Sequence, residues 1–315
     1  MHPPATAMDG AAREEETAPV STIETPTAPT LPATLRLGPT HLTVSHLDGS
    51  IAFYERTVGL QLHDRDASRA AMGAGGEDLL VLVEGAGGGP GRRHAGLYHF
   101  ALLFESREAL AHAVKRLAAT QTRIEGASDH GVSEAIYLRD PDDNGIELYA
   151  DRPREDWPPP RQPGERVEMY TIALDVRALM DTVAGEAIQA RAGAGLRTGH
   201  LHLHVGDIER GLAFYRDVLG FEVMANLASA AFVSAGGYHH HLGFNVWLGT
   251  DVKPKPHDVA GLRHWTVLLE SADEIDEVRA RVEAAGLAVE RNDGGFLVRD
   301  PWETAVAFDV APLPA

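Results

Sequence analysis

Alternating apolar and polar positions recur along the chain, separated by amphipathic stretches. Residues 40–62 read THLTVSHLDGSIAFYERTVGLQL, and residues 201–223 read LHLHVGDIERGLAFYRDVLGFEV. In both segments the alternation predicts a strand, and the amphipathic stretch with its aromatic pair predicts a helix. A glycine and a second predicted strand follow in each case. The two segments are therefore copies of one strand–helix–strand pattern.

A second pair of segments repeats in the same way. Residues 96–106 (GLYHFALLFES) match residues 261–271 (GLRHWTVLLES), and a predicted helix follows each, at 108–118 and 273–285. Strands that end in an Asp-Pro dipeptide come next, at positions 140–141 and 300–301. Self-similarity of this kind indicates modules that share a core. We predict an α+β protein of four βαβββ modules, at residues 37–92 (module one), 95–153 (module two), 198–250 (module three) and 260–312 (module four).

Two segments lie outside the modules. Residues 1–34 are rich in Ala, Pro, Thr and Glu, and their composition is typical of a disordered tail. Residues 154–197 form a linker with a proline cluster at 158–160. The first pair of modules thus spans residues 37–153 and the second spans 198–312.

Composition limits the function. The 28 basic and 46 acidic residues leave a net charge of −18, which disfavours nucleic acid as a partner. Without cysteine the chain has no disulfide, thiolate metal site or cysteine nucleophile. No apolar run reaches membrane-spanning length, and the first ten residues lack the features of a secretory signal, so a cytoplasmic location is expected.

Three residues are candidate metal ligands. His99 lies in the first strand of module two, with His264 as its counterpart in module four, and His200 opens module three. Glu147 lies in the last strand of module two, where module four has Ala307. A structural alternative for Glu147 is an exposed carboxylate on an edge strand. Two imidazoles and one carboxylate suit non-haem iron(II), because open positions remain for a substrate and O₂.

Module three carries a further run of imidazoles, His239, His240 and His241. Strand alternation would send the first and last to one side and His240 to the other. Either the run is a solvated turn, or one of its members faces a pocket as an acid or base, because imidazole titrates near neutrality. Trp247 and Trp265 lie in predicted strands, where core packing is expected.

With these motifs the sequence resembles the vicinal oxygen chelate superfamily, which includes glyoxalase I, fosfomycin-resistance proteins and type I extradiol dioxygenases. The closer resemblance is to bacterial catechol 2,3-dioxygenases of the CatE type. It is carried by GLYHFALL, SDHGVSEAIYLRDPDDNGIELYADRP, GHLHLHV and FVSAGGYHHHLGFNVW, and it covers residues 36–312. The resemblance implies two paired open-barrel domains and an Fe(II) site, with Mn(II) as the alternative metal.

The resemblance also implies roles for individual residues. The metal ligands would be His99, Glu147 and His200. The catalytic histidine on the last strand of module three would be His240, with His239 and His241 as further candidates. Tyr137 matches a tyrosine three residues before the Asp-Pro, and His130, in an HGVS sequence, matches a substrate-contacting histidine.

The ligand set departs from the usual layout of these enzymes, in which modules one and two pair, as do three and four. Modules three and four offer His200 and His264 but no glutamate, and Pro39 occupies the place of a ligand in module one. We therefore predict that module two associates with module three, and module one with module four. The alternative is a site completed by His41 within modules one and two.

The expected reaction is extradiol cleavage of a catechol by O₂ to a 2-hydroxymuconic semialdehyde type of product. The expected partners are thus a small aromatic diol and O₂. The alternatives are a glyoxalase-like metal-dependent isomerase or lyase, and a metal-free binding or resistance protein. The sequence does not specify which catechol is cleaved or whether the chain forms a homo-oligomer.

Overall fold

The computed structural model describes residues 30–312 except 86, 88, 90, 92, 162–164 and 293. The predicted tail falls mostly on residues 1–29, which lie outside the described residues. Its last part is described, and Leu31 within it is buried and donates a backbone hydrogen bond to Gly220. Leu31 thus belongs to the hydrophobic core although it lies before the predicted boundary at residue 34.

The strands of the described residues form two nine-stranded sheets. The first sheet has the order β16-β17-β18-β15-β2-β5-β4-β3, with β1 paired to β15. Its strands are β1 (Arg36–Leu37), β2 (Thr40–Val44), β3 (Gln61–Arg65), β4 (Arg69–Gly73), β5 (Asp78–Glu84), β15 (Gly261–Leu269), β16 (Glu290–Asn292), β17 (Gly295–Arg299) and β18 (Ala305–Val310). They come from modules one and four.

The second sheet has the order β10-β7-β8-β9-β6-β11-β14-β13-β12. Its strands are β6 (Gly96–Phe104), β7 (Ile124–Asp129), β8 (Ser133–Arg139), β9 (Gly145–Asp151), β10 (Ile172–Ala173), β11 (Arg197–His204), β12 (Glu222–Asn226), β13 (Ala230–Ser234) and β14 (Leu242–Asn245). Apart from β10, which lies in the linker, they come from modules two and three.

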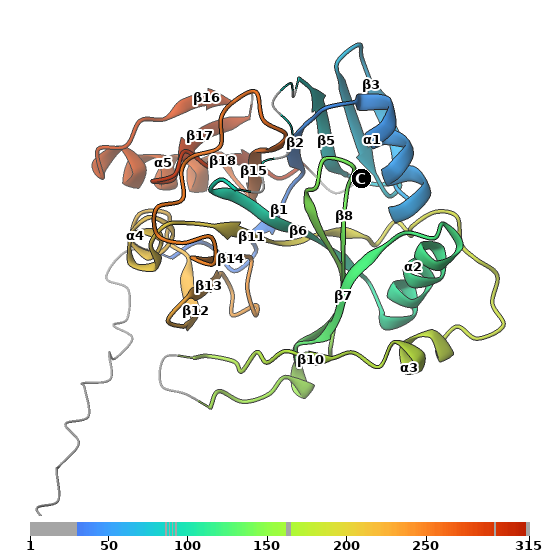
Figure 1. The fold of residues 1–315 in the computed structure, drawn as a ribbon. Helices are drawn as coiled ribbons and strands as arrows, with labels where there is room; N and C mark the ends of the chain where they lie inside the picture. The colour runs from blue at the N-terminus through green and yellow to red at the C-terminus, as the bar shows by residue number, and fades with distance from the viewer. Residues whose placement is uncertain are drawn as a thin grey trace, which may run out of the picture.

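Each sheet is joined at its centre by first strands of different modules. In the second sheet β6 pairs antiparallel with β11, with Phe100 opposite Leu201; in the first, β15 pairs with β2, with Leu262 opposite Leu42. The two central strands of the second sheet cross the middle of the molecule (Figure 1). The predicted association of module two with three, and of one with four, is confirmed. Each sheet therefore takes one module from residues 37–153 and one from 198–312.

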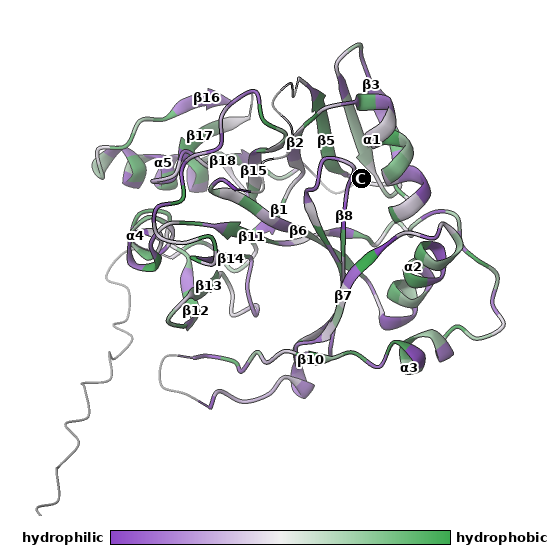
Figure 2. Cartoon of the chain, viewed as in Figure 1, coloured by the Kyte–Doolittle hydropathy of each residue, from purple (hydrophilic) through white to green (hydrophobic). Residues whose placement is uncertain are grey.

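The modules carry their helices at the predicted positions: α1 (Leu47–Phe53), α2 (Arg107–Ala119), α4 (Ile208–Leu212) and α5 (Ala272–Ala284). The linker adds α3 (Val176–Asp181) and a short 3₁₀ turn, η2 (Arg154–Asp156), which were not predicted. The side chains of Ser106 and Ser271 cap α2 and α5, and Ser271 forms a capping box with Glu274. Hydrophobic and hydrophilic residues share α2 (Figure 2), and its buried face includes Leu110 and Leu117.

The helices of modules one and three end in π turns, η1 (Tyr54–Val58) and η3 (Ala213–Val218). The buried hydroxyl of Tyr54 donates to Asp140 Oδ2 at 2.8 Å, and that of Tyr215 donates to Asp300 Oδ2 at 2.9 Å. Each tyrosine thus reaches the Asp-Pro turn of the next module along the chain. These two bonds connect the sheets, because in each bond the tyrosine and the aspartate belong to modules of different sheets.

The linker is structured rather than a plain spacer. Its strand β10 pairs with β7 at the edge of the second sheet, and α3 contacts α2. Leu179 of α3 is fully buried. Among the described residues, no helix combines the length and apolar character needed to cross a membrane.

Candidate metal centre

A row of paired residues crosses four strands of the second sheet. Tyr137 on β8 is opposite Glu147 on β9, Glu147 is opposite Ala101 on β6, and Ala101 is opposite His200 on β11. Paired residues on neighbouring strands point to the same face of a sheet, so these side chains share one face. His99 lies two residues before Ala101 and therefore joins the same face. Ala101 has only a methyl group, which leaves space between the carboxylate and the imidazole.

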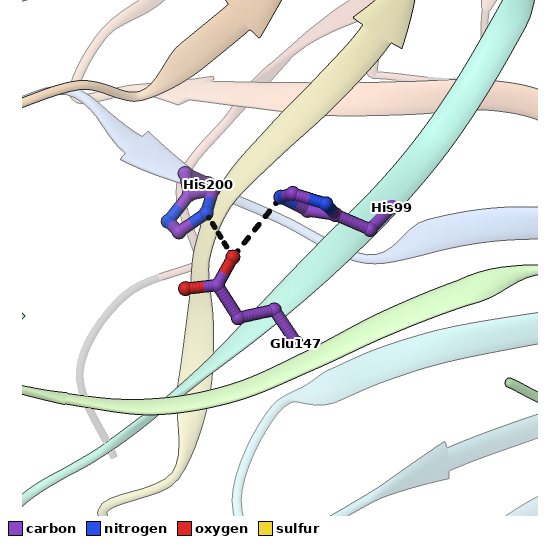
Figure 3. Close-up of side chains that lie close together, drawn as sticks. All are labelled: His99, Glu147 and His200. Atoms are coloured by element: carbon purple, nitrogen blue, oxygen red, sulfur yellow. Dashed lines mark hydrogen bonds and ion pairs between the residues drawn. The ribbon is translucent and has the colours of Figure 1, made fainter. Parts of the chain in front are cut away.

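The three candidate ligands converge in this space (Figure 3). Nε2 of His99 lies 3.0 Å from Oε2 of Glu147, and Nε2 of His200 lies 3.1 Å from the same oxygen. One ligand atom from each residue lies within 4.8 Å of the other two. All three side chains are buried, with 6%, 2% and 2% of His99, Glu147 and His200 exposed. Glu147 is therefore not an exposed edge carboxylate.

Electrostatics keep this cluster in a form suited to metal binding. Burial alone would raise the pKa of Glu147, but His200 and His99 beside it hold that pKa well below its ordinary value. Burial lowers the pKa of His99, which favours the neutral ring. A carboxylate with neutral imidazoles is the protonation state in which these groups ligate a metal.

His130 and Tyr137 form a hydrogen-bonded pair beside the cluster. Nδ1 of His130 lies 2.9 Å from the backbone carbonyl of Tyr170, and its Nε2 lies 2.7 Å from the Tyr137 hydroxyl. A carbonyl only accepts, so Nδ1 carries a proton, and Nε2 of the neutral ring accepts from the Tyr137 hydroxyl. Burial, followed by the charge of Glu147, raises the pKa of Tyr137 well above its ordinary value.

The run of three histidines lies in a turn before β14, not in the strand. His240 lines the cavity, and its ring centroid lies 4.2 Å from that of His200. His239 is fully buried between His240 and Asp151. Its Nδ1 lies 2.8 Å from Nδ1 of His240, and its Nε2 lies 2.9 Å from Oδ1 of Asp151. Nδ1 of His241 instead lies 2.9 Å from Oγ of Ser234. Of the three, His240 lines the cavity and His239 and His241 do not, although the segment is a turn rather than a pleated strand.

The His239 contacts specify proton positions. Asp151 accepts, so Nε2 of His239 carries a proton, and Nδ1 of the neutral His239 ring accepts from Nδ1 of His240. Nε2 of His240 is then the nitrogen without a proton. Burial, followed by the nearby His200, lowers the pKa of His240 well below its ordinary value.

The cavity beside the cluster has a volume of about 570 Å³. His202 and Trp247 line it, and neither was predicted as a site residue. His202 lies opposite His99, and its Nε2 accepts from Asn245 Nδ2 at 2.9 Å. The sequence could have indicated His202, because it lies two residues after His200 in the same strand and therefore on the same face. The expectation of core packing is wrong for Trp247, which is 54% exposed because β14 ends before it, whereas Trp265 is fully buried as expected.

His41 and His264 lie elsewhere, on the first sheet. They are opposite each other on β2 and β15, and their rings stack with centroids 3.9 Å apart. Within the described part of the chain, the cluster of potential ligands around Glu147 includes neither of them. The alternative site completed by His41 is therefore wrong, because its strand joins module four rather than module two.

The fold and cluster agree with comparisons to known proteins. The profile of the Glyoxalase/Bleomycin resistance protein/Dioxygenase superfamily matches residues 36–148 and 197–308, and the chain belongs to this superfamily. The fold class and the family resemblance are thereby confirmed. The chain is 43% identical over 270 residues to a catechol-2,3-dioxygenase of Bacillus subtilis (strain 168), which covers 84% of this chain and 93% of that protein.

Two solved structures share the fold. A proposed dioxygenase from Bacillus subtilis subsp. subtilis str. 168 aligns with a TM-score of 0.57 and 14% identity, over 90% of this chain and 87% of that one. Glyoxalase I from Zea mays aligns with a TM-score of 0.53 and 16% identity, over 88% of this chain and 92% of that one. At these identities the likeness concerns the fold alone.

Proposed function

We propose that this protein is an extradiol dioxygenase that opens a catechol ring with O₂ to give a 2-hydroxymuconic semialdehyde type of product. The observation that carries the proposal is the convergence of two buried imidazoles and one buried carboxylate from modules two and three. The similarity to a catechol-2,3-dioxygenase over most of the chain supports the same reaction.

The residues present fit a divalent metal. Nε2 of His99 is buried and has no hydrogen-bond partner among the described residues, although it lies 3.0 Å from a Glu147 oxygen. The buried carboxylate of Glu147 lies beside two imidazoles, and a cation bound there would balance its charge. His99, Glu147 and His200 would hold Fe(II), since two imidazoles with one carboxylate on one side suit this metal, and Mn(II) accepts the same set. When bound, iron(II) supplies Lewis acidity and the electron transfer to O₂ that the organic ring cannot make alone.

Tyr137 and His130 would position the diol and take up a proton. The raised pKa of Tyr137 keeps its hydroxyl protonated, so it is a hydrogen-bond donor or a proton carrier rather than a standing anion. His130 Nε2 accepts from that hydroxyl. A proton leaving the catechol can thus pass through the Tyr137 oxygen to His130, whose Nδ1 is held by the Tyr170 carbonyl.

His240 would serve the oxygen side of the reaction. Its ring lies against that of His200 and lines the cavity. Because Nδ1 donates to His239, Nε2 is the basic nitrogen, which would accept the proton of the second catechol hydroxyl and later return it to an oxygen of the substrate. Asp151 and His239 keep the ring in this orientation.

The test is anaerobic reconstitution with Fe(II), followed by addition of catechol in air. We expect a yellow ring-opened product from the wild type and none from Glu147→Gln, which preserves the size of the side chain but removes its charge. Glu283→Gln, an exposed change on α5, is the matched control.

Metal analysis of the same samples identifies the alternatives. We expect bound iron in the wild type and in the control, and its loss in Glu147→Gln. Full ring-opening activity in Glu147→Gln would overturn the site. A purified and reconstituted protein that binds catechol but no iron, manganese or zinc would instead indicate a sequestering protein.

A further inference from the structure

The cavity beside the metal cluster is lined by both polar and apolar side chains. Module two contributes polar groups, among them Glu125, His130 and Tyr137, and a few apolar ones. Module three contributes the apolar residues Ala225, Leu227, Ala230, Phe232 and Trp247, which we call the module-three wall, and also the polar residues His200, His202, Ser229 and His240. Except for the indole nitrogen of Trp247, the side chains of the module-three wall have no polar atom. A ligand bound at the cluster would therefore meet polar groups around the metal ligands and an apolar surface at the module-three wall.

The cationic side chain that lines the cavity is already paired. Arg139 is the one arginine or lysine among the described lining residues, and its Nε lies 2.8 Å from Glu125 Oε2 and 3.6 Å from Asp143 Oδ1. Its Nη1 donates to the Asp143 carbonyl at 2.8 Å. Away from the metal ligands, Glu125 and Glu165 also line the cavity. A negatively charged substituent that extends away from the metal would thus meet carboxylates and an arginine that is already paired.

Two large apolar side chains of the module-three wall are unusually exposed. Trp247 and Leu227 are 54% and 42% exposed, and both border the cavity. Trp247 is held in place, since its ring lies edge-on to Tyr98 at 5.4 Å and its Nε1 donates to Ser229 Oγ at 3.3 Å. An apolar surface that stays exposed beside a cavity is typical of a ligand contact.

We propose that the substrate is an uncharged catechol that carries an apolar alkyl or aryl substituent, which packs on Leu227, Phe232 and Trp247. This inference rests on the proposed dioxygenase function. The size of the cavity supports it, because about 570 Å³ is in the range occupied by drug-sized ligands and exceeds the need of a bare ring. Catechols with a carboxylate substituent are disfavoured by the charges described above.

The first test compares two substrates of similar size, 4-propylcatechol and 3,4-dihydroxyphenylacetate, with the iron-loaded wild-type protein. We expect kcat/KM to be roughly tenfold to a hundredfold lower for the carboxylate, because it would be desolvated beside like charges. Anaerobic dissociation constants, measured by tryptophan fluorescence quenching, should rank in the same order. Equal or better use of 3,4-dihydroxyphenylacetate would overturn the inference.

The second test introduces a cation into the module-three wall. Leu227→Arg should shift the preference toward 3,4-dihydroxyphenylacetate by roughly tenfold or more, because it supplies a partner for the carboxylate. The matched control is Leu62→Arg, on β3 of the other sheet, where the leucine is 37% exposed. An unchanged preference in Leu227→Arg, or the same shift in both variants, would overturn the placement of the substituent.

The two proposals fail in different ways. If the dioxygenase function is wrong, iron-loaded protein opens neither catechol itself nor any substituted catechol. If only the substrate inference is wrong, catechol is opened and the carboxylated compound is opened as well as 4-propylcatechol.

Discussion

Oε2 of Glu147 lies 3.1 Å from Nε2 of His200, although the two residues are 53 positions apart and belong to different modules. Their strands, β9 and β11, are not adjacent in the sheet, because β6 lies between them. The long side chains bridge over Ala101 of the middle strand. The site thus depends on a small residue that has no chemistry of its own.

Enlarging that residue should abolish metal binding. Ala101→Val adds two methyl groups in the fully buried space between the ligands, and overpacking of this kind costs about 1–3 kcal/mol. We expect iron content to fall sharply, with a smaller fall in thermal stability. Ala101→Gly, which keeps the space open, is the control and should still bind iron. Full iron binding by Ala101→Val would show that the space is not needed.

Asp151 should act on the reaction through His239 and His240. Asp151→Asn removes the negative charge that orients His239 and so loosens the position of His240. Changes in groups that support catalytic residues commonly cost roughly 10- to 100-fold in activity, and we expect a loss of this size in kcat. Iron content and KM should stay close to the wild-type values, since neither depends on this contact.

A matched control for this change is Asp276→Asn, on the exposed surface of α5, which should leave kcat unchanged. Asp151→Glu retains the charge and should recover part of the rate. Loss of iron in Asp151→Asn, or no recovery with glutamate, would indicate a structural role instead.

The two tyrosine–aspartate bonds between the sheets should contribute similarly to stability. Tyr54→Phe and Tyr215→Phe each remove one buried hydroxyl that donates to a carboxylate. We expect each change to lower the free energy of unfolding by about 1–2 kcal/mol, measured by urea titration. The two losses should be close to additive, because the bonds are separate. No loss from either change would show that the remaining donors to these carboxylates are sufficient.

The stacked pair His41–His264 should make folding stability depend on pH. Burial is the first cause that lowers the pKa of each ring, to about 3 for His41 and about 4 for His264, with nearby Arg263 as a further cause for both. Arg69 adds to the effect on His41, as Arg299 does on His264.

The unfolded chain therefore binds more protons than the folded protein below about pH 6.5, the ordinary pKa of histidine. Stability from this pair is fully present above pH 6.5, declines as the pH falls below that value, and is lost once the pH is below about 4 for His264 and about 3 for His41. We expect the free energy of unfolding to fall by about 1–3 kcal/mol between pH 7 and pH 4. The fall is modest because both rings are only partly buried. His41→Gln should flatten this slope in urea titrations at several pH values; an unchanged slope would contradict the assignment.

The sequence determined the repeated architecture, because alternation and amphipathic spacing follow local rules that survive in each module. It also indicated which modules meet. Glu147 has no acidic counterpart at Ala307, and Pro39 occupies a ligand position, so only modules two and three offer the full ligand set. That inference combined the comparison of copies within one chain with the ligand layout that the family resemblance implies.

Tertiary structure decided what local patterns do not encode. The direction of His240 is set by a turn and by the contacts of His239, and the exposure of Trp247 by the end of β14. His41 meets His264 rather than the metal cluster because its strand pairs with module four. In each case the outcome depends on which surface another segment covers, and such packing is settled only when distant parts of the chain come together.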